Sequence, residues 1–122
     1  MKNTDKKTVS KTIDASGQTL GRVASEAAVS LMGKTRASYE RHIYSGLPVK
    51  IINASKLSIT TKKLENIFHT RYSGSRGGLK TMTGTYTAKT KGLKELIKLA
   101  IYRMLPGNKL RREMMKNLKI ED

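Results

Sequence analysis

Apolar side chains recur at helical spacing in two long stretches of the chain. The first stretch holds Leu20, Val23, Ala24, Ala27 and Leu31, and the second holds Leu93, Leu96, Ile97, Ala100, Ile101, Met104 and Leu105. Positions three and four apart lie on one face of an α-helix, so each set forms a continuous apolar stripe. The pattern predicts one helix over residues 20–32, between a Thr19 cap and Gly33, and another over 92–105, ended by Pro106-Gly107.

Shorter apolar runs predict strands. The run at 49–54 (VKIINA) is the clearest, and those at 9–15 (VSKTIDA) and 66–72 (NIFHTRY) follow. The alternating 56–60 (KLSIT) predicts a weaker strand or an extended connection. A further amphipathic helix is predicted over 108–118, with Asn108 as its N-cap. Strands followed by helices in this order are typical of an α/β domain with a small, mostly parallel sheet.

The segment from Ser73 to Gly92 shows neither the helical spacing of apolar residues nor an apolar run typical of a strand. It is rich in Gly, Ser and Thr, which predicts a long loop at about 73–92. Loops of more than about 12–15 residues inside compact domains are usually functional or disordered. The segment is therefore a candidate binding element.

The chain has the size of one domain and a strongly basic composition. Its 122 residues include 25 Lys and Arg but only 9 Asp and Glu, which gives a formal net charge of +16. Leu, Ile, Val and Phe make up only about a fifth of the residues, close to the level at which a highly charged chain stays disordered. We therefore expect a small domain that is stabilised in part by a polyanionic partner.

The composition also excludes several classes of protein. The absence of Cys excludes disulfides and thiolate metal sites, and two distant His do not form a typical metal site, so neither a metal nor a cofactor is predicted. No uncharged stretch exceeds eight residues, far below the roughly 20 apolar residues of a transmembrane helix. The basic N-terminal segment runs into no apolar stretch, so no signal peptide is predicted and a cytoplasmic location is expected.

The positive charge is densest between Glu65 and Glu95. The 29 residues between these two carboxylates contain no Asp or Glu, although solvated surfaces usually mix both signs. The cations in this stretch are Arg71, Arg76, Lys80, Lys89, Lys91 and Lys94. Contact with a polyanion explains this asymmetry, and a basic loop that is merely solvated is the alternative.

The turn from Gly17 to Arg22 is a first candidate anion site. Arg22 falls in the first turn of the predicted helix, where backbone N–H groups attract anions. Neither the G-x-G-x-x-G nor the P-loop spacing is present. A grip on a nucleic-acid backbone, a small-nucleotide site and a purely structural Gly turn all stay open.

Two more segments combine cations with groups that suit RNA. After the first helix, Lys34, Arg36 and Arg41 alternate with tyrosines that could stack on unpaired bases or belong to the core. The densest candidate is the segment 69–80, whose glycines permit close backbone approach and whose hydroxyls, amides and cations can bind phosphates. Its candidate contacts are Arg71, Tyr72, Ser73, Gly74, Arg76, Gly77, Gly78 and Lys80.

No catalytic group is evident. Carboxylates are few, and no Ser, His and Asp grouping stands out. A turn-type hydrogen bond explains Asp14 without catalysis, and His69 on an alternating strand fits a half-buried histidine better than a catalyst. We therefore predict that the protein is not an enzyme and has no small-molecule substrate.

Taken in order, several motifs resemble the bacterial large-subunit ribosomal protein L13 family. Single motifs are weak, but the ordered set covers residues from about 9 to 120 and is highly specific. The matching segments are Asp14-Ala15, 17–24 (GQTLGRVA), 31–34 (LMGK), 52–54 (INA) with Lys56, Leu57, Thr60 and Lys62, 72–74 (YSG), 77–80 (GGLK), Ala100, 104–110 (MLPGNKL), Met115 and Leu118-Lys119.

This resemblance implies a three-layer α/β/α fold around a mostly parallel four-stranded sheet, with a basic extension at 1–8 and one RNA-binding domain at 9–122. It implies a non-catalytic constituent of the large ribosomal subunit, located in cytoplasmic ribosomes. Such a protein binds large-subunit ribosomal RNA early in assembly, beside neighbouring ribosomal proteins. By motif, the implied RNA-facing positions are Arg22, Lys34, Arg36, Lys62, Lys63, Arg71, the loop 73–80, Lys109, Arg111 and Arg112.

Two other function classes remain as alternatives at this point. The first is an enzyme of small-nucleotide or phosphoester chemistry, built on the turn from Gly17 to Arg22. The second is a general DNA-compacting protein, which the net charge alone would also permit.

Overall fold

The computed structural model describes residues 10–44 and 47–122. The predicted extension at 1–8 and the first residue of the predicted domain lie outside the described residues. In chain order the elements are β1 (Lys11–Asp14), α1 (Leu20–Met32), β2 (Val49–Ile52), the 3-10 turn η1 (Ala54–Lys56), α2 (Thr61–Asn66), β3 (Phe68–Tyr72), β4 (Leu79–Thr83), α3 (Gly84–Thr90), α4 (Leu93–Met104), α5 (Leu110–Lys116) and β5 (Leu118–Ile120).

Three strands form a parallel sheet in the order β1-β2-β5. Along β1 and β2, Ile13, Val49 and Ile51 are buried, whereas Thr12 on β1 and Lys119 on β5 are exposed. Since successive side chains of a strand point to opposite faces, this alternation means that one face of the sheet is packed and the other is open among the described residues.

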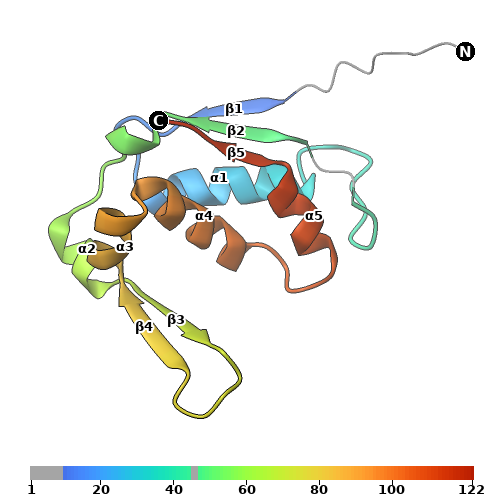
Figure 1. Ribbon diagram of the computed structural model, residues 1–122. Coiled ribbons are helices and arrows are strands. Elements are labelled where there is room, and N and C mark those ends of the chain that lie inside the picture. The colour runs from blue at the N-terminus through green and yellow to red at the C-terminus, as the bar shows by residue number, and fades with distance from the viewer. Residues whose placement is uncertain (1–9, 45–46) are drawn as a thin grey trace, which may run out of the picture.

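Helices α1 and α4 cover the packed face, and α5 continues beside them (Figure 1). Leu31, Ile97 and Ile101 are fully buried in this core, and small alanines on α1 allow close packing. The chain leaves α1 at Gly33, whose φ of 82° is left-handed and whose N–H bonds the Ser30 carbonyl. The predicted helices over 20–32 and 92–105 are thereby confirmed.

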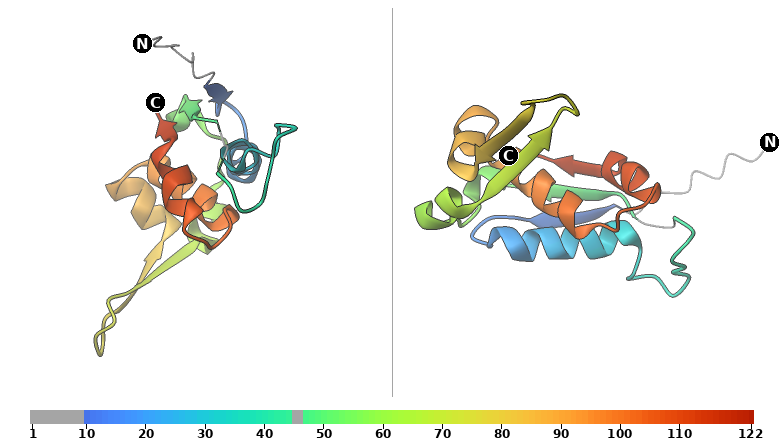
Figure 2. Two further views of the ribbon diagram at one scale, coloured as in Figure 1. Left: turned by 90° about the vertical axis from the view of Figure 1, so that its right-hand side faces the viewer. Right: turned by 90° about the horizontal axis from the view of Figure 1, so that it is seen from below.

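A second unit, the β3–β4 hairpin with α2 and α3, extends away from this body (Figure 2). Threonine side chains cap both short helices: Thr60 Oγ1 accepts from Lys63 N and Thr83 Oγ1 from Tyr86 N, each at 3.3 Å. Gly84 begins α3 so close to α2 that an added Cβ would lie 2.7 Å from the Leu64 carbonyl oxygen. Glycine is therefore what allows the hairpin to join the helices here.

The expected three-layer fold with four sheet strands is wrong for the described residues. The parallel sheet has three strands, and helices lie on one of its faces. The predicted strand at 66–72 does form, as β3, but its partner is β4, because the Gly-containing turn at 73–78 reverses the chain at once. The weak strand at 56–60 makes a single parallel bridge, Thr19 with Ser58.

Two further expectations need correction. The predicted long loop at 73–92 is a six-residue turn followed by β4 and α3. The predicted helix over 108–118 is shorter, because the chain becomes strand β5 from Leu118. Asn108 does act at its start, where Oδ1 accepts from Leu110 N at 3.1 Å.

Candidate nucleic-acid interface

The tip of the β3–β4 hairpin presents the densest predicted site to solvent. Arg71 faces Lys80 across the two antiparallel strands, and Tyr72 faces Leu79. All four side chains are exposed, as is Arg76 in the turn. Within the turn, Gly74 and Gly77 take left-handed φ values of 84° and 74°, which other residues rarely adopt. The chain therefore holds three cations and an aromatic ring on one narrow projection.

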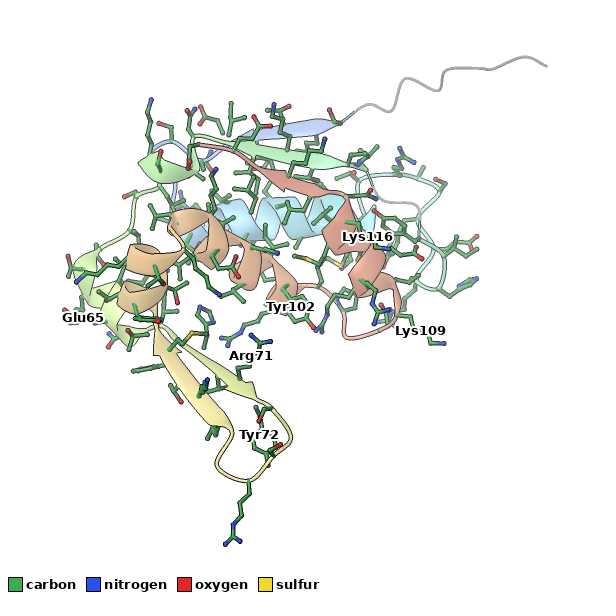
Figure 3. All side chains as sticks on the ribbon, in the orientation of Figure 1. Glu65, Arg71, Tyr72, Tyr102, Lys109 and Lys116 are labelled. Carbon is green, nitrogen blue, oxygen red and sulfur yellow. The ribbon has the colours of Figure 1, made fainter. Side chains whose placement is uncertain are left out.

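A wide basic concavity lies between α4 and α5. Its volume is about 1010 Å³, and five basic side chains line it against one carboxylate, Glu113. The basic side chains are those of Lys98, Lys109, Arg111, Arg112 and Lys116, and Tyr102 adds an aromatic ring. The predicted turn at 109–112 is mostly the first turn of α5: Lys109 precedes the helix, and Arg111 and Arg112 lie on it. These three residues line the concavity together with Lys98, Tyr102 and Lys116, which the sequence did not single out as RNA contacts. Figure 3 labels Tyr102, Lys109 and Lys116.

The loop after α1 joins this end of the molecule. Lys34 and Arg41 line a cavity of about 210 Å³ together with Asn108 and Leu110. The Tyr44 hydroxyl accepts a hydrogen bond from Asn117 Nδ2, which fastens the loop to the end of α5. Lys34 and Arg41, predicted from a segment far from α5 in sequence, are therefore neighbours of the α4–α5 turn, and Arg36 is exposed on the same loop.

The remaining predicted residues are not part of this cluster. Arg22 lines a separate shallow concavity on α1, beside Lys11 and Glu26. Lys62 and Lys63 are exposed on α2, at the opposite end of the molecule from α5 (Figure 1). The predicted contacts thus surround the protein instead of forming one patch.

Ion pairs divide the cations of the described residues into two groups. Three lysines pair with carboxylates at 2.9–3.0 Å: Lys11 with Glu26, Lys50 with Glu121, and Lys94 with Asp122. Within residues 10–44 and 47–122, no predicted RNA contact forms such a pair. Unpaired cations keep their full field for an external anion.

The turn from Gly17 to Arg22 is built into the fold and offers little to a nucleotide. Gly17 N donates to the Lys56 carbonyl at 3.0 Å, and Gln18 N donates to Ala15 at 3.2 Å. Asp14 Oδ1 accepts from Ser16 N at 2.9 Å and from Asn53 Nδ2 at 3.0 Å. These hydrogen bonds, led by the one from Asn53, lower the pKa of Asp14. The carboxylate is a turn acceptor and not a base held ready for catalysis.

His69 is the one buried ionisable group of the hairpin among the described residues. It is only 7% exposed, and neither ring nitrogen has a hydrogen-bond partner. Burial lowers the pKa of His69, and the nearby Arg103 guanidinium lowers it further against an opposing effect of Glu95. The side chain is therefore a neutral packing residue, buried more deeply than the surface or half-buried position expected from the sequence.

The sequence matches one family of known proteins over most of its length. A family model described as ribosomal protein L13 matches residues 9–120. The chain belongs to the ribosomal protein L13 family. The resemblance found in its motifs is thereby confirmed, and the chain is a ribosomal protein and not an enzyme, as predicted.

Individual L13 relatives cover most of the chain at moderate identity. The protein of Thermotoga petrophila, named large ribosomal subunit protein uL13, is 43% identical over 108 residues, which is 88% of this chain and 72% of the relative. The proteins of the same name from Aquifex aeolicus and Roseobacter denitrificans are 44% and 43% identical, with 74% and 70% of their lengths covered.

Other classes of site find no support in the described part of this L13 chain. None of its helices is long and apolar enough to cross a membrane. Within the same residues, no three His, Asp or Glu side chains gather as metal ligands would.

Proposed function

We propose that the protein is a constituent of the large ribosomal subunit that binds large-subunit ribosomal RNA directly and supports early subunit assembly, without catalysis. Its further partners are neighbouring large-subunit proteins, and its location is the cytoplasmic ribosome. The family membership and the names of its relatives support the subunit assignment. The direct RNA contact is supported by the arrangement of its charges.

The observation that carries the RNA contact is the division of the cations. Lys11, Lys50 and Lys94 pair with carboxylates at 2.9–3.0 Å, whereas the cations of the hairpin tip and of the α4–α5 concavity have no such partner among the described residues. A phosphate backbone is a polyanion with one charge per nucleotide, so it gains most where protein cations are free. We therefore assign the hairpin tip and the α4–α5 end as the principal RNA-binding surfaces.

The salt dependence of binding to large-subunit RNA tests the direct contact. If about six phosphates are neutralised, the log–log plot of affinity against salt has a slope of roughly −4 to −5. Duplex DNA and a mononucleotide serve as competitors, because a DNA-compacting protein or a nucleotide enzyme would prefer them. Binding that is indifferent to salt, or lost to either competitor, would overturn the proposal.

A matched pair of double variants tests the surface. Arg71→Ala with Arg76→Ala and Lys50→Ala with Lys94→Ala each remove two positive charges, but only the first pair lies on the hairpin. We expect filter binding to weaken about tenfold or more for the hairpin variant and far less for the control, with folding of both checked by circular dichroism. Equal losses would mean that net charge alone drives binding.

Membership in the subunit has its own test. The tagged full chain is expected to co-sediment with large subunits through a high-salt wash, because a structural constituent is enclosed by RNA on several sides. Release of the protein into the supernatant at moderate salt would contradict this part of the proposal.

A further inference from the structure

The α4–α5 concavity contains an arginine that is not free to move. Arg111 Nε donates to the Pro106 carbonyl at 3.2 Å, and Nη2 donates to Leu105 at 3.5 Å. These bonds anchor the guanidinium to the end of α4. Gly107 adds room for it, because a Cβ at that position would lie 3.0 Å from Arg111 Nη2.

The anchored guanidinium lies over an exposed aromatic ring. The Cζ atom of Arg111 is 4.3 Å from the centroid of Tyr102, and the tyrosine is 45% exposed. A cation at this distance from a ring face is held by the π-electrons. Tyr102 and Arg111 therefore form a preorganised pair in the concavity, which Lys98, Lys109 and Lys116 also line. None of these three lysines pairs with a carboxylate among the described residues; Tyr102, Lys109 and Lys116 are labelled in Figure 3.

This arrangement suits a nucleobase better than a phosphate. Nε and Nη2 form one of the two forks through which a guanidinium can bind phosphate, and on Arg111 both already donate to backbone carbonyls, which leaves only the Nη1/Nη2 end for an anion. Guanidinium planes and aromatic rings are the surfaces on which unpaired bases stack in RNA complexes. A base inside a duplex has both faces covered by its neighbours, so only an unpaired base can use such a surface.

We propose that the α4–α5 concavity binds an unpaired nucleotide of RNA, whose base stacks on the Tyr102–Arg111 pair while the surrounding lysines hold its phosphates. This inference rests on the proposed RNA-binding function and assigns one part of that interface a specific ligand. Tyr102 is a base-stacking residue, and Arg111 both stacks and positions the ring.

The test uses an RNA stem-loop with a single 2-aminopurine in a uridine loop, and a fully paired duplex of the same length as its control. Uridines stack weakly, so the free probe is bright, and stacking on the protein quenches it. The full-length chain is expected to quench the loop probe and to bind the stem-loop more tightly than the duplex.

Variants separate stacking from charge. Tyr102→Leu and Arg111→Lys are expected to lose the quenching and to bind the stem-loop about tenfold more weakly, with little change on the duplex. Tyr102→Phe keeps the ring and should behave as the unaltered protein. Tyr86→Leu removes another exposed tyrosine, outside the concavity, and should have no effect on quenching.

The outcomes distinguish this inference from the function on which it rests. If the unaltered protein binds large-subunit RNA but neither quenches the loop probe nor prefers it, the stacking site is wrong while RNA binding stands. If the protein does not bind large-subunit RNA, the proposed function is wrong as well. Should Tyr102→Leu fail to fold, Arg111→Lys decides, since it keeps the charge, and undiminished quenching by that variant would overturn the proposal.

Discussion

The sheet with α1 and α4 buries most of its large apolar side chains, whereas the β3–β4 hairpin leaves Phe68, Tyr72 and Leu79 in solvent. Leu31, Ile51 and Ile97 are 0% exposed, but Phe68 and Leu79 on the hairpin are 54% and 64% exposed. Burial of apolar area is the main favourable term in folding. The first unit therefore carries most of the stability of the isolated chain, and the second is held by its hydrogen-bond ladder and its short helices.

The two units also differ in how their positive charges are paired. Lys11 and Lys50 on the sheet are paired with carboxylates, while Arg71 and Lys80 on the hairpin are not. An exposed strand pair with free cations is unfavourable for a solitary protein, because it offers apolar surface and unbalanced charge to water. On the hairpin, cations without a carboxylate partner among the described residues therefore coincide with exposed apolar side chains, and an anionic partner would cover both.

Matched leucine truncations give the largest expected contrast. Leu31→Ala empties a fully buried site and should lower the free energy of unfolding by about 3–5 kcal/mol. Leu79→Ala removes a mostly exposed side chain and should change it by less than about 0.5 kcal/mol. Urea denaturation followed by circular dichroism measures both, and comparable losses would show that the hairpin is an equal part of the core.

The unit with the larger buried core is also the one whose elements could be predicted from the sequence. The helices at 20–32 and 92–105 follow directly from dense apolar periodicity, since burial on one face imposes that spacing. Strand β4 and helix α3 could not be found this way, because their apolar residues are few and two of the large ones among them, Leu79 and Tyr86, are exposed. The threonine caps at Thr60 and Thr83 were the one local signal for the two short helices.

The candidate site was predictable in its charges but not in its geometry. The basic residues of the hairpin and of the 109–112 turn are evident from composition and motif. The Tyr102–Arg111 pair joins residues on two helices across a turn, and Tyr102 by itself fits the polar side of an amphipathic helix. Only the fold places Lys34 and Arg41 beside this turn.

Two glycine substitutions, one in each unit, are expected to change the free energy of unfolding in opposite directions. Gly84→Ala would place a Cβ 2.7 Å from the Leu64 carbonyl oxygen and should destabilise the chain by about 1–3 kcal/mol, since backbone cannot easily move away. Gly21→Ala in α1 meets nothing within 4 Å and should stabilise by about 0.5–1 kcal/mol through its higher helix propensity. Thermal unfolding monitors both, and a stabilising Gly84→Ala would mean that α2 and α3 are not closely joined.

His69 provides a smaller test of how the hairpin docks on α4. Its ring nitrogens are buried without partners, so His69→Phe should stabilise the chain by about 1 kcal/mol. Because the pKa of His69 is lowered in the folded state, the unfolded chain binds the proton first. Stability should therefore decline as the pH falls below about 6.5, and the advantage of the Phe variant should grow.

Unfolding curves of both proteins at pH 7 and pH 5 check this expectation. A constant difference between His69→Phe and the unaltered chain across this range would show that His69 stays accessible to protons in the folded state.

Lysine acetylation of the full chain, read by mass spectrometry with and without large-subunit RNA, shows directly which surfaces the RNA covers. Lys80 on the hairpin and Lys109 in the α4–α5 concavity are exposed, as is Lys119 on the outer face of the sheet. We predict that RNA lowers the reactivity of Lys80 and Lys109 severalfold and leaves that of Lys119 nearly unchanged. Protection of Lys119 with Lys80 and Lys109 still reactive would contradict the assignment of the hairpin tip and the α4–α5 concavity as the RNA-binding surfaces.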